Sequence, residues 1–184
     1  MLLTILLLVL GFVVLLMVIG WLLPREITIE RAIGIDKPAE AIFPWIANLQ
    51  TWPDWTIWNK QEDASLVYSY SGAAAGLGAA MSWTAKKMGD GMLTIHDAKP
   101  DRFIRYEMRM KDRSIVVHGN VELESVGGGA TLVMWFDNIN LGANPARRWL
   151  GLLLRPMMGK VFHRNLAGLR TAAETGKASG PGPK

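Results

Sequence analysis

The chain has 184 residues, a net charge of +4 and no cysteine. The missing cysteine excludes disulfides, thiolate metal sites and cysteine nucleophiles. Acidic residues are absent between Asp137 and Glu174, so the positive charge is concentrated in one stretch. Nucleic-acid binding is not expected, because these cations do not extend over the predicted strands and no recognition motif accompanies them.

The first segment, Met1 to Leu23, contains no charged side chain. About 20 apolar residues are enough to cross a bilayer, and a secretory signal would need basic residues before a shorter apolar core. The segment therefore predicts a single-pass membrane anchor, with a cleaved signal or a buried core helix as alternatives. Arg25, Arg31 and Lys37 follow it, and the positive-inside rule favours a cytoplasmic position for the rest of the chain.

Residues 24–175 have the pattern of one domain. Apolar and polar residues alternate over 26–35, as in a half-buried strand. An amphipathic helix is expected from Pro38 to Gln50, followed by an aromatic turn around Pro53. Turn residues, including Lys111 to Arg113, then separate six short alternating segments: 66–70, 79–84, 92–96, 104–110, 115–124 and 131–136.

A long helical pattern begins at Pro145 and continues to Ala173, with Pro156 expected to kink or divide it. Residues 176–184 are rich in Gly, Pro and Ser, and are expected to form a disordered tail. The order of elements predicts an α+β fold, a curved seven-stranded antiparallel sheet wrapped around the C-terminal helix. That helix is the only predicted element long enough to cover the apolar face of the sheet.

Several segments carry a family resemblance. Residues 29–35 with 38–43, the run Leu49-Gln50-Thr51-Trp52-Pro53-Asp54-Trp55, the strand at 129–135 and the helix segment 162–169 together resemble the START-like, or SRPBCC, superfamily. The likeness is strongest to its polyketide cyclase/dehydrase-like branch of helix-grip proteins. The resemblance covers about Glu26 to Glu174 and implies a cavity between the sheet and the last helix. Its members include carriers, cyclases and sensors, so the fold does not name a function.

A Met-rich and aromatic set is the candidate lining of that cavity. On the strand at 104–110, Tyr106, Met108 and Met110 share the inward face, opposite Arg105 and Arg109. Methionine adapts to varied shapes and suits a flat or apolar ligand. The full set is Tyr68, Tyr70, Met81, Trp83, Tyr106, Met108, Met110, Met157, Met158 and Phe162. The alternative is a filled core.

No catalytic, cofactor or metal site is predicted. His96, His118 and His163 lie on different elements without metal-ligand spacing, and Ser82 lacks the strand-turn-helix elbow of a nucleophile. An enzyme would need Tyr106 or His96 in the cavity to assist proton transfer.

The helix around Arg147 and Arg148 is basic and leucine-rich, so it either contacts anionic lipid or presents a solvated cationic face. The leading hypothesis is a membrane-anchored domain that binds a hydrophobic small molecule or lipid. The alternatives are a cyclase/dehydrase-type enzyme and a membrane-docked interaction module without a ligand.

Overall fold

The computed structural model describes residues 1–111 and 115–182. Helix α1 (Leu2–Leu22) precedes strand β1 (Glu26–Ile35), helix α2 (Ala39–Ala47) and the short 3-10 helix η1 (Leu49–Asp54). The strands β2 (Val67–Gly72), β3 (Ala79–Thr84), β4 (Gly91–Lys99), β5 (Phe103–Met110), β6 (Val116–Gly127) and β7 (Ala130–Asn140) follow, and α3 (Pro145–Thr175) completes the order. The turn expected at Lys111 to Arg113 lies largely outside the described residues.

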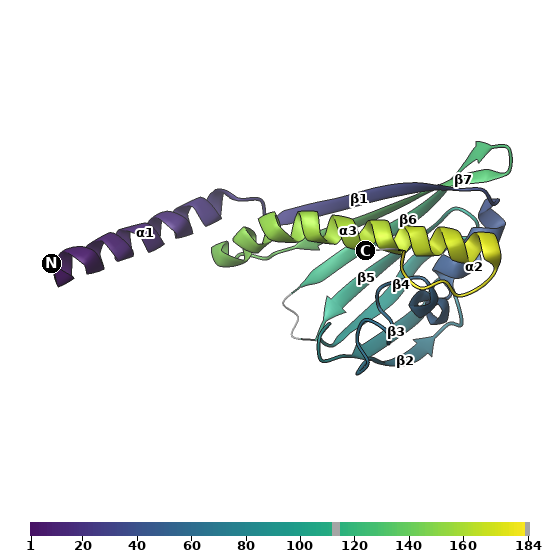
Figure 1. Cartoon of the computed structure of the whole chain (residues 1–184), viewed down its shortest axis with the longest axis horizontal. Helices are drawn as coiled ribbons and strands as arrows, with labels where there is room; N and C mark the ends of the chain where they lie inside the picture. The colour runs from purple at the N-terminus through teal and green to yellow at the C-terminus, as the bar shows by residue number, and fades with distance from the viewer. Residues whose placement is uncertain (112–114, 183–184) are drawn as a thin grey trace.

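The strands form one antiparallel sheet in the order β1-β7-β6-β5-β4-β3-β2, with α3 running along it on the side of β1 (Figure 1). The predicted helix-grip fold is therefore confirmed. Asn144 caps the start of α3 by accepting a hydrogen bond from the Ala146 amide, and Gly176 ends the helix in the left-handed conformation. Between them α3 continues through Pro156 as one helix rather than two.

The centre of the core is aromatic. Trp52 and Trp55, from η1 and the residue after it, pack against Trp135 of β7 with ring centroids 5.8 and 5.7 Å apart. Phe162 of α3 also packs against Trp135, with ring centroids 4.6 Å apart. All four side chains are buried, so this cluster joins the sheet, the aromatic turn and the last helix.

Helix α1 joins the domain at one end of the sheet, where β1 begins. The antiparallel register pairs Glu26 at the start of β1 with Asn140, and Asn140 with Val116. Further along this end of the sheet, Met110 of β5 pairs with Gly91 of β4, Gly91 with Trp83 of β3, and Trp83 with Tyr68 of β2. We call Tyr68, Trp83, Gly91 and Met110 the end row. The end row and the start of β1 thus lie at the same end of the sheet (Figure 1).

Helix α1 projects away from the domain, and its 21 residues are long and apolar enough to cross a membrane (Figure 1). Its C-terminal part contacts the beginning of α3. Most of its large apolar side chains are exposed.

Residues 176–182 differ from the expected disordered tail, whose last two residues lie outside the described part of the chain. The amides of Ser179 and Gly180 donate to the Asp54 carbonyl, and the Gly182 amide donates to the Arg164 carbonyl. A Cβ on Gly168 of α3 would lie 2.4 Å from the Gly180 carbonyl oxygen. Glycine therefore permits the close backbone approach that seats this segment on α3.

Candidate functional site

A buried polar network crosses three strands beneath the aromatic core. The Tyr106 hydroxyl donates to Oδ1 of Asp137 at 2.6 Å, and the Trp135 indole N–H donates to the Tyr106 oxygen at 2.8 Å. Tyr106 and Asp137 are both paired with Gly119 of β6, which lies between them. A Cβ on Gly119 would lie 2.0 Å from the Tyr106 ring, so only glycine lets this ring cross β6 to reach Asp137.

Burial sets the protonation of this network. Removal from water raises the pKa of Asp137 to about 7, although the hydrogen bonds from Tyr106 and Trp135 favour the ionised carboxylate and limit the rise. Burial, together with the charge of Asp137, raises the pKa of Tyr106 well above its usual value. Tyr106 therefore stays protonated and donates a hydrogen bond to Asp137 over the physiological range, whereas burial brings the pKa of the Asp137 carboxyl group to about 7.

A small apolar void adjoins the network on the inner face of the sheet. Its volume is about 10 Å³, close to the minimum that one water molecule requires. Side chains of β2–β5, β7 and the aromatic turn surround it: Trp52, Trp58, Tyr68, Met81, Trp83, Leu93, Tyr106, Met108 and Asp137. The inner face is thus nearly filled in this conformation, with Tyr106 and Asp137 at the boundary of the remaining space.

Trp83 repeats the arrangement of Tyr106 at the end of the sheet, but its polar atom is unpaired. A Cβ on Gly91, its partner on β4, would lie 2.4 Å from the Trp83 ring, so the indole crosses β4 over a glycine. Trp83 is only 5% exposed, and its Nε1 has no hydrogen-bond partner among the described residues. A buried donor without a partner costs about 1–3 kcal/mol, which marks Trp83 as a position where a ligand acceptor would be stabilising.

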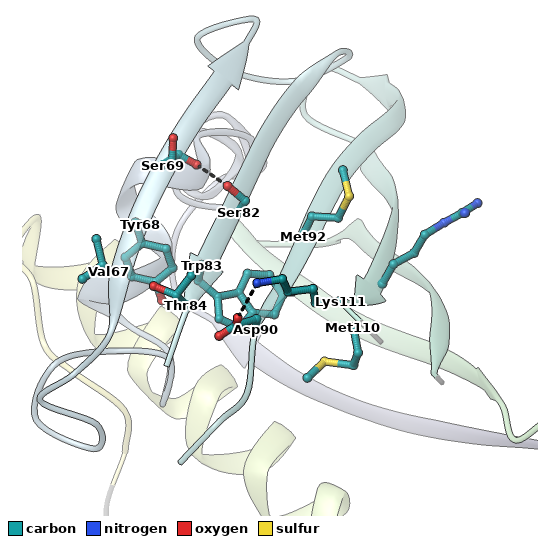
Figure 2. A pocket seen from close by; sticks show the side chains of 12 residues that line it. Val67, Tyr68, Ser69, Ser82, Trp83, Thr84, Asp90, Met92, Met110 and Lys111 are labelled. Carbon is teal, nitrogen blue, oxygen red and sulfur yellow. Dashed lines mark hydrogen bonds and ion pairs between the residues drawn. The ribbon is translucent and has the colours of Figure 1, made fainter. Parts of the chain in front are cut away.

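An open groove of about 510 Å³ is lined by residues at the same end of β2–β5 (Figure 2). This volume is within the roughly 300–1,000 Å³ of small-molecule sites. The end row contributes to it together with Val67, Ser69, Ser82, Thr84, Asp90, Met92, Arg109 and Lys111. Lys111 pairs with Asp90 at 3.1 Å, which gives the groove a charged rim. Tyr68 and Trp83 line both the groove and the inner void, so they separate one from the other.

Comparison with known proteins identifies the family. Residues 26–174 match the polyketide cyclase/dehydrase and lipid transport family, which is most of the chain. The chain belongs to this family. The match begins with β1 and stops one residue before the end of α3, so it leaves α1 outside the family domain. The resemblance seen in the sequence is thereby confirmed. No curated protein sequence matches the chain.

Solved structures share the fold at low sequence identity. DynU16, a protein of the dynemicin biosynthetic locus, is 12% identical with a TM-score of 0.58 over 83% of this chain and 49% of its own. The di-domain aromatase/cyclase BexL of the BE-7585A pathway is 17% identical with a TM-score of 0.56, covering 82% and 47%. Aha1 from Colwellia psychrerythraea is 17% identical with a TM-score of 0.56, covering 82% and 98%. The chain therefore spans about half the length of DynU16 and BexL.

Within this family domain the predicted lining residues fall into two groups. Tyr68, Met81, Trp83, Tyr106 and Met108 surround the inner void, and Met110 lines the groove. The remaining four line neither space: Tyr70 is 38% exposed on the edge strand β2, Phe162 is packed on Trp135, Met157 is 55% exposed, and Met158 is half-buried against the core. Phe162 is part of the aromatic cluster, and Met157 lies on the exposed face of α3, which points away from the void.

Other sequence candidates lie on the outer face of the sheet. Ser82, His96 and His118 are exposed there, whereas Asp137 is buried on the inner face, so a Ser-His-Asp arrangement is not assembled. Of the two proposed proton-transfer residues, only Tyr106 reaches the void. No group of three or more metal-ligating side chains is present in residues 1–111 and 115–182. Sequence reasoning missed the pairing of Tyr106 with Asp137 because their contact depends on Gly119.

Proposed function

We propose that this protein is a membrane-anchored binder of a hydrophobic small molecule or lipid whose oxygen atom accepts a hydrogen bond from Trp83. The observation that carries the proposal is the buried, unpaired Nε1 of Trp83 at the boundary between groove and void. Membership of a family of cyclases and lipid-transport proteins supports a ligand of this class.

The void must enlarge to hold such a ligand, and its lining is suited to that change. Met81 and Met108 are unbranched and can adopt several rotamers at small cost. Tyr68 is held to the aromatic turn by one hydrogen bond, from its hydroxyl to the Trp58 carbonyl at 2.6 Å. Rotation of Tyr68 and Trp83 would join the void to the groove, because these two side chains separate them.

The position of the end row favours a ligand drawn from a membrane. The row lies at the end of the sheet where β1 begins, and β1 follows α1 after three residues. If α1 crosses the bilayer, the groove opens on the side of the domain nearest to lipid. Arg109 and Lys111 also line the groove, where they are paired with the carboxylates of Glu107 and Asp90.

The test uses the full-length protein in detergent. Native mass spectrometry should detect a co-purified apolar species, and the fluorescent polyene cis-parinaric acid should bind in competition with it. Trp83→Phe keeps an aromatic side chain, smaller than the indole, and removes the N–H donor. We expect about tenfold weaker binding, the value of one hydrogen bond of about 1.4 kcal/mol. Trp45→Phe on α2 is the matched control and should bind as wild type. An empty protein that takes up no probe would refute the proposal.

A second candidate function is proton transfer on a bound carbonyl compound. It is favoured by one observation, that Asp137 has a pKa of about 7 and lines the void beside Tyr106. A carboxylate with this pKa can accept a proton from the carbon next to a carbonyl group. The readout is deuterium exchange at that carbon in a β-keto amide probe, measured by NMR. Exchange that is as fast with Asp137→Asn as with wild type would exclude this candidate.

A further inference from the structure

The end of α1 is held against α3 by specific contacts rather than by a flexible linker. The Arg148 guanidinium is buried and donates to the carbonyl oxygens of Trp21 at 2.6 Å and Leu23 at 3.1 Å. The Trp21 carbonyl belongs to the last turn of α1 and Leu23 follows the helix directly, so the guanidinium lies at the end where a cation is favoured by the helix dipole. The Trp149 indole N–H donates to the Leu16 carbonyl at 3.1 Å. We call these contacts the latch.

Glycine makes the latch possible. A Cβ on Gly20 would lie 2.8 Å from the Pro145 carbonyl oxygen and 3.0 Å from Nε1 of Trp149. The first turn of α3 therefore lies directly on the backbone of α1 at Gly20, closer than any larger residue would allow. Gly20 is the one buried residue of α1.

The latch determines how far along α1 the start of α3 lies. Leu16 precedes Leu22, the last residue of α1, by six residues, which is about 9 Å along a helix that rises 1.5 Å per residue. Trp149 therefore lies beside the last two turns of α1 and not beyond its end. In a bilayer crossed by α1, the start of α3 would reach the level of the head groups (Figure 1).

The side chains of this part of α3 match that environment. Leu150, Leu152, Leu153 and Met157 are 52–70% exposed. Leu150, Leu153 and Met157 follow the i, i+3, i+7 spacing of one helix face, opposite the buried Gly151 and Gly159. Arg147 and Lys160 are exposed basic residues at the two ends of this stretch, and no acidic residue lies between Asp137 and Glu174.

We infer that the first four turns of α3 form a second membrane contact, in which Leu150, Leu153 and Met157 enter the lipid interface beside α1. Apolar burial and the attraction of nearby basic residues to anionic lipid both stabilise this position. The inference rests on the proposed function only in taking α1 as a membrane span. Its consequence is that the domain has a fixed orientation, with the end row directed toward the bilayer.

The experiment uses the full chain in vesicles of equal parts phosphatidylcholine and phosphatidylglycerol. Because the chain has no cysteine, single fluorophores can be attached at Leu153→Cys, at Thr171→Cys near the other end of α3, and at Leu8→Cys in α1. Lipids that carry a nitroxide near the head group should quench the Leu153 position but not the Thr171 position. Lipids with a nitroxide deep in the acyl chain should quench the Leu8 position.

The outcomes separate the inference from the anchor on which it depends. Quenching at Leu8 together with a Leu153 signal equal to that of Thr171 would overturn the second contact and leave the anchor standing. No quenching at Leu8 would refute the anchor and the second contact together. A Leu153 signal that is shielded from water yet unaffected by either nitroxide would indicate contact with another copy of the chain, and would also overturn the inference.

Discussion

Tyr106 and Trp83 are placed by the same device, yet they differ in one respect. Each is an aromatic residue on one strand whose ring crosses a glycine on the next strand, Gly119 for Tyr106 and Gly91 for Trp83. The Tyr106 hydroxyl both donates to Asp137 and accepts from Trp135, whereas the Trp83 Nε1 has no partner among the described residues. The polar atom of Tyr106 is fully hydrogen-bonded within the core, whereas that of Trp83 lacks a partner in the described part of the chain and lies at an open groove.

The difference indicates that the side chains around Trp83 can be rearranged at a smaller cost in stability than those around Tyr106. The other buried indoles are satisfied, since Trp52 donates to the Ile46 carbonyl, Trp55 to the Trp45 carbonyl and Trp135 to the Tyr106 oxygen. An unpaired buried donor is costly, and its persistence beside a groove is typical of a site that is completed by a ligand. Substitutions at the two sites and the pH dependence of stability test this contrast, and the expected change in the free energy of unfolding decreases from the glycines to Trp83.

Substituting the two glycines should give unequal losses of stability. We expect Gly119→Ala to lower the free energy of unfolding by about 3–5 kcal/mol, because the displaced Tyr106 loses its packing and leaves Asp137 unpaired. Gly91→Ala should cost about 1–3 kcal/mol, since Trp83 can move toward the groove. Urea denaturation of both variants measures the two losses. Equal losses would remove the distinction between the two pairs.

The stability of the protein should depend on pH through Asp137. Its pKa is about 7 when folded against an ordinary 3.8, so between these values the native state holds a proton that the unfolded chain has released. The free energy of unfolding therefore falls as pH rises from about 4 to about 7, by at most about 4 kcal/mol, and is level above that range with respect to this group. Asp137→Asn should flatten the curve. A variant with the wild-type slope would show that other groups cause it.

Removing the Tyr106 hydroxyl should have a moderate effect. Tyr106→Phe keeps the ring over Gly119 but deprives Asp137 of its shortest hydrogen bond and Trp135 of an acceptor. We expect a loss of about 1–3 kcal/mol in thermal or urea unfolding. If stability is unchanged, the network does not contribute to folding.

The smallest effect on stability is expected at Trp83. Trp83→Phe removes a buried donor that already lacks a partner, so the free energy of unfolding should stay level or rise by about 1 kcal/mol. Ligand affinity, by contrast, should fall. A destabilisation as large as that of Tyr106→Phe would mean that the Trp83 N–H is satisfied in the folded protein, and the two pairs would be alike.

The fold was predictable from the sequence because its signals are local. Alternation over 26–35 marks β1, and the bounds of β3 at 79–84 agree with the prediction. Pro145 marks the start of α3, where its missing amide is harmless. The long helix continues through Pro156, which lies on the exposed surface near β1, so the packing of α3 on the sheet outweighs the local preference of proline.

The candidate site was only partly predictable, because its details depend on contacts across strands. Alternation correctly directed Tyr106 and Met108 inward, but it carries no information on whether their side chains fill the space. The pairing of Tyr106 with Asp137 requires the register of three strands and a glycine between them. The α3 methionines were assigned to the cavity as part of the Met-rich and aromatic set, whereas Met157 lies on the exposed face of the helix and Met158 is half-buried against the core.

The latch determines where this chain can be divided. A soluble version that starts at Pro24 would lose both α1 carbonyls bonded to Arg148, leaving a guanidinium group without those acceptors and uncovering the surface that Gly20 and Trp21 protect. Several exposed leucines would adjoin that surface, and such a protein should aggregate during purification. The family domain and its apolar helix are therefore a single unit for expression, and detergent belongs in the preparation from the first step.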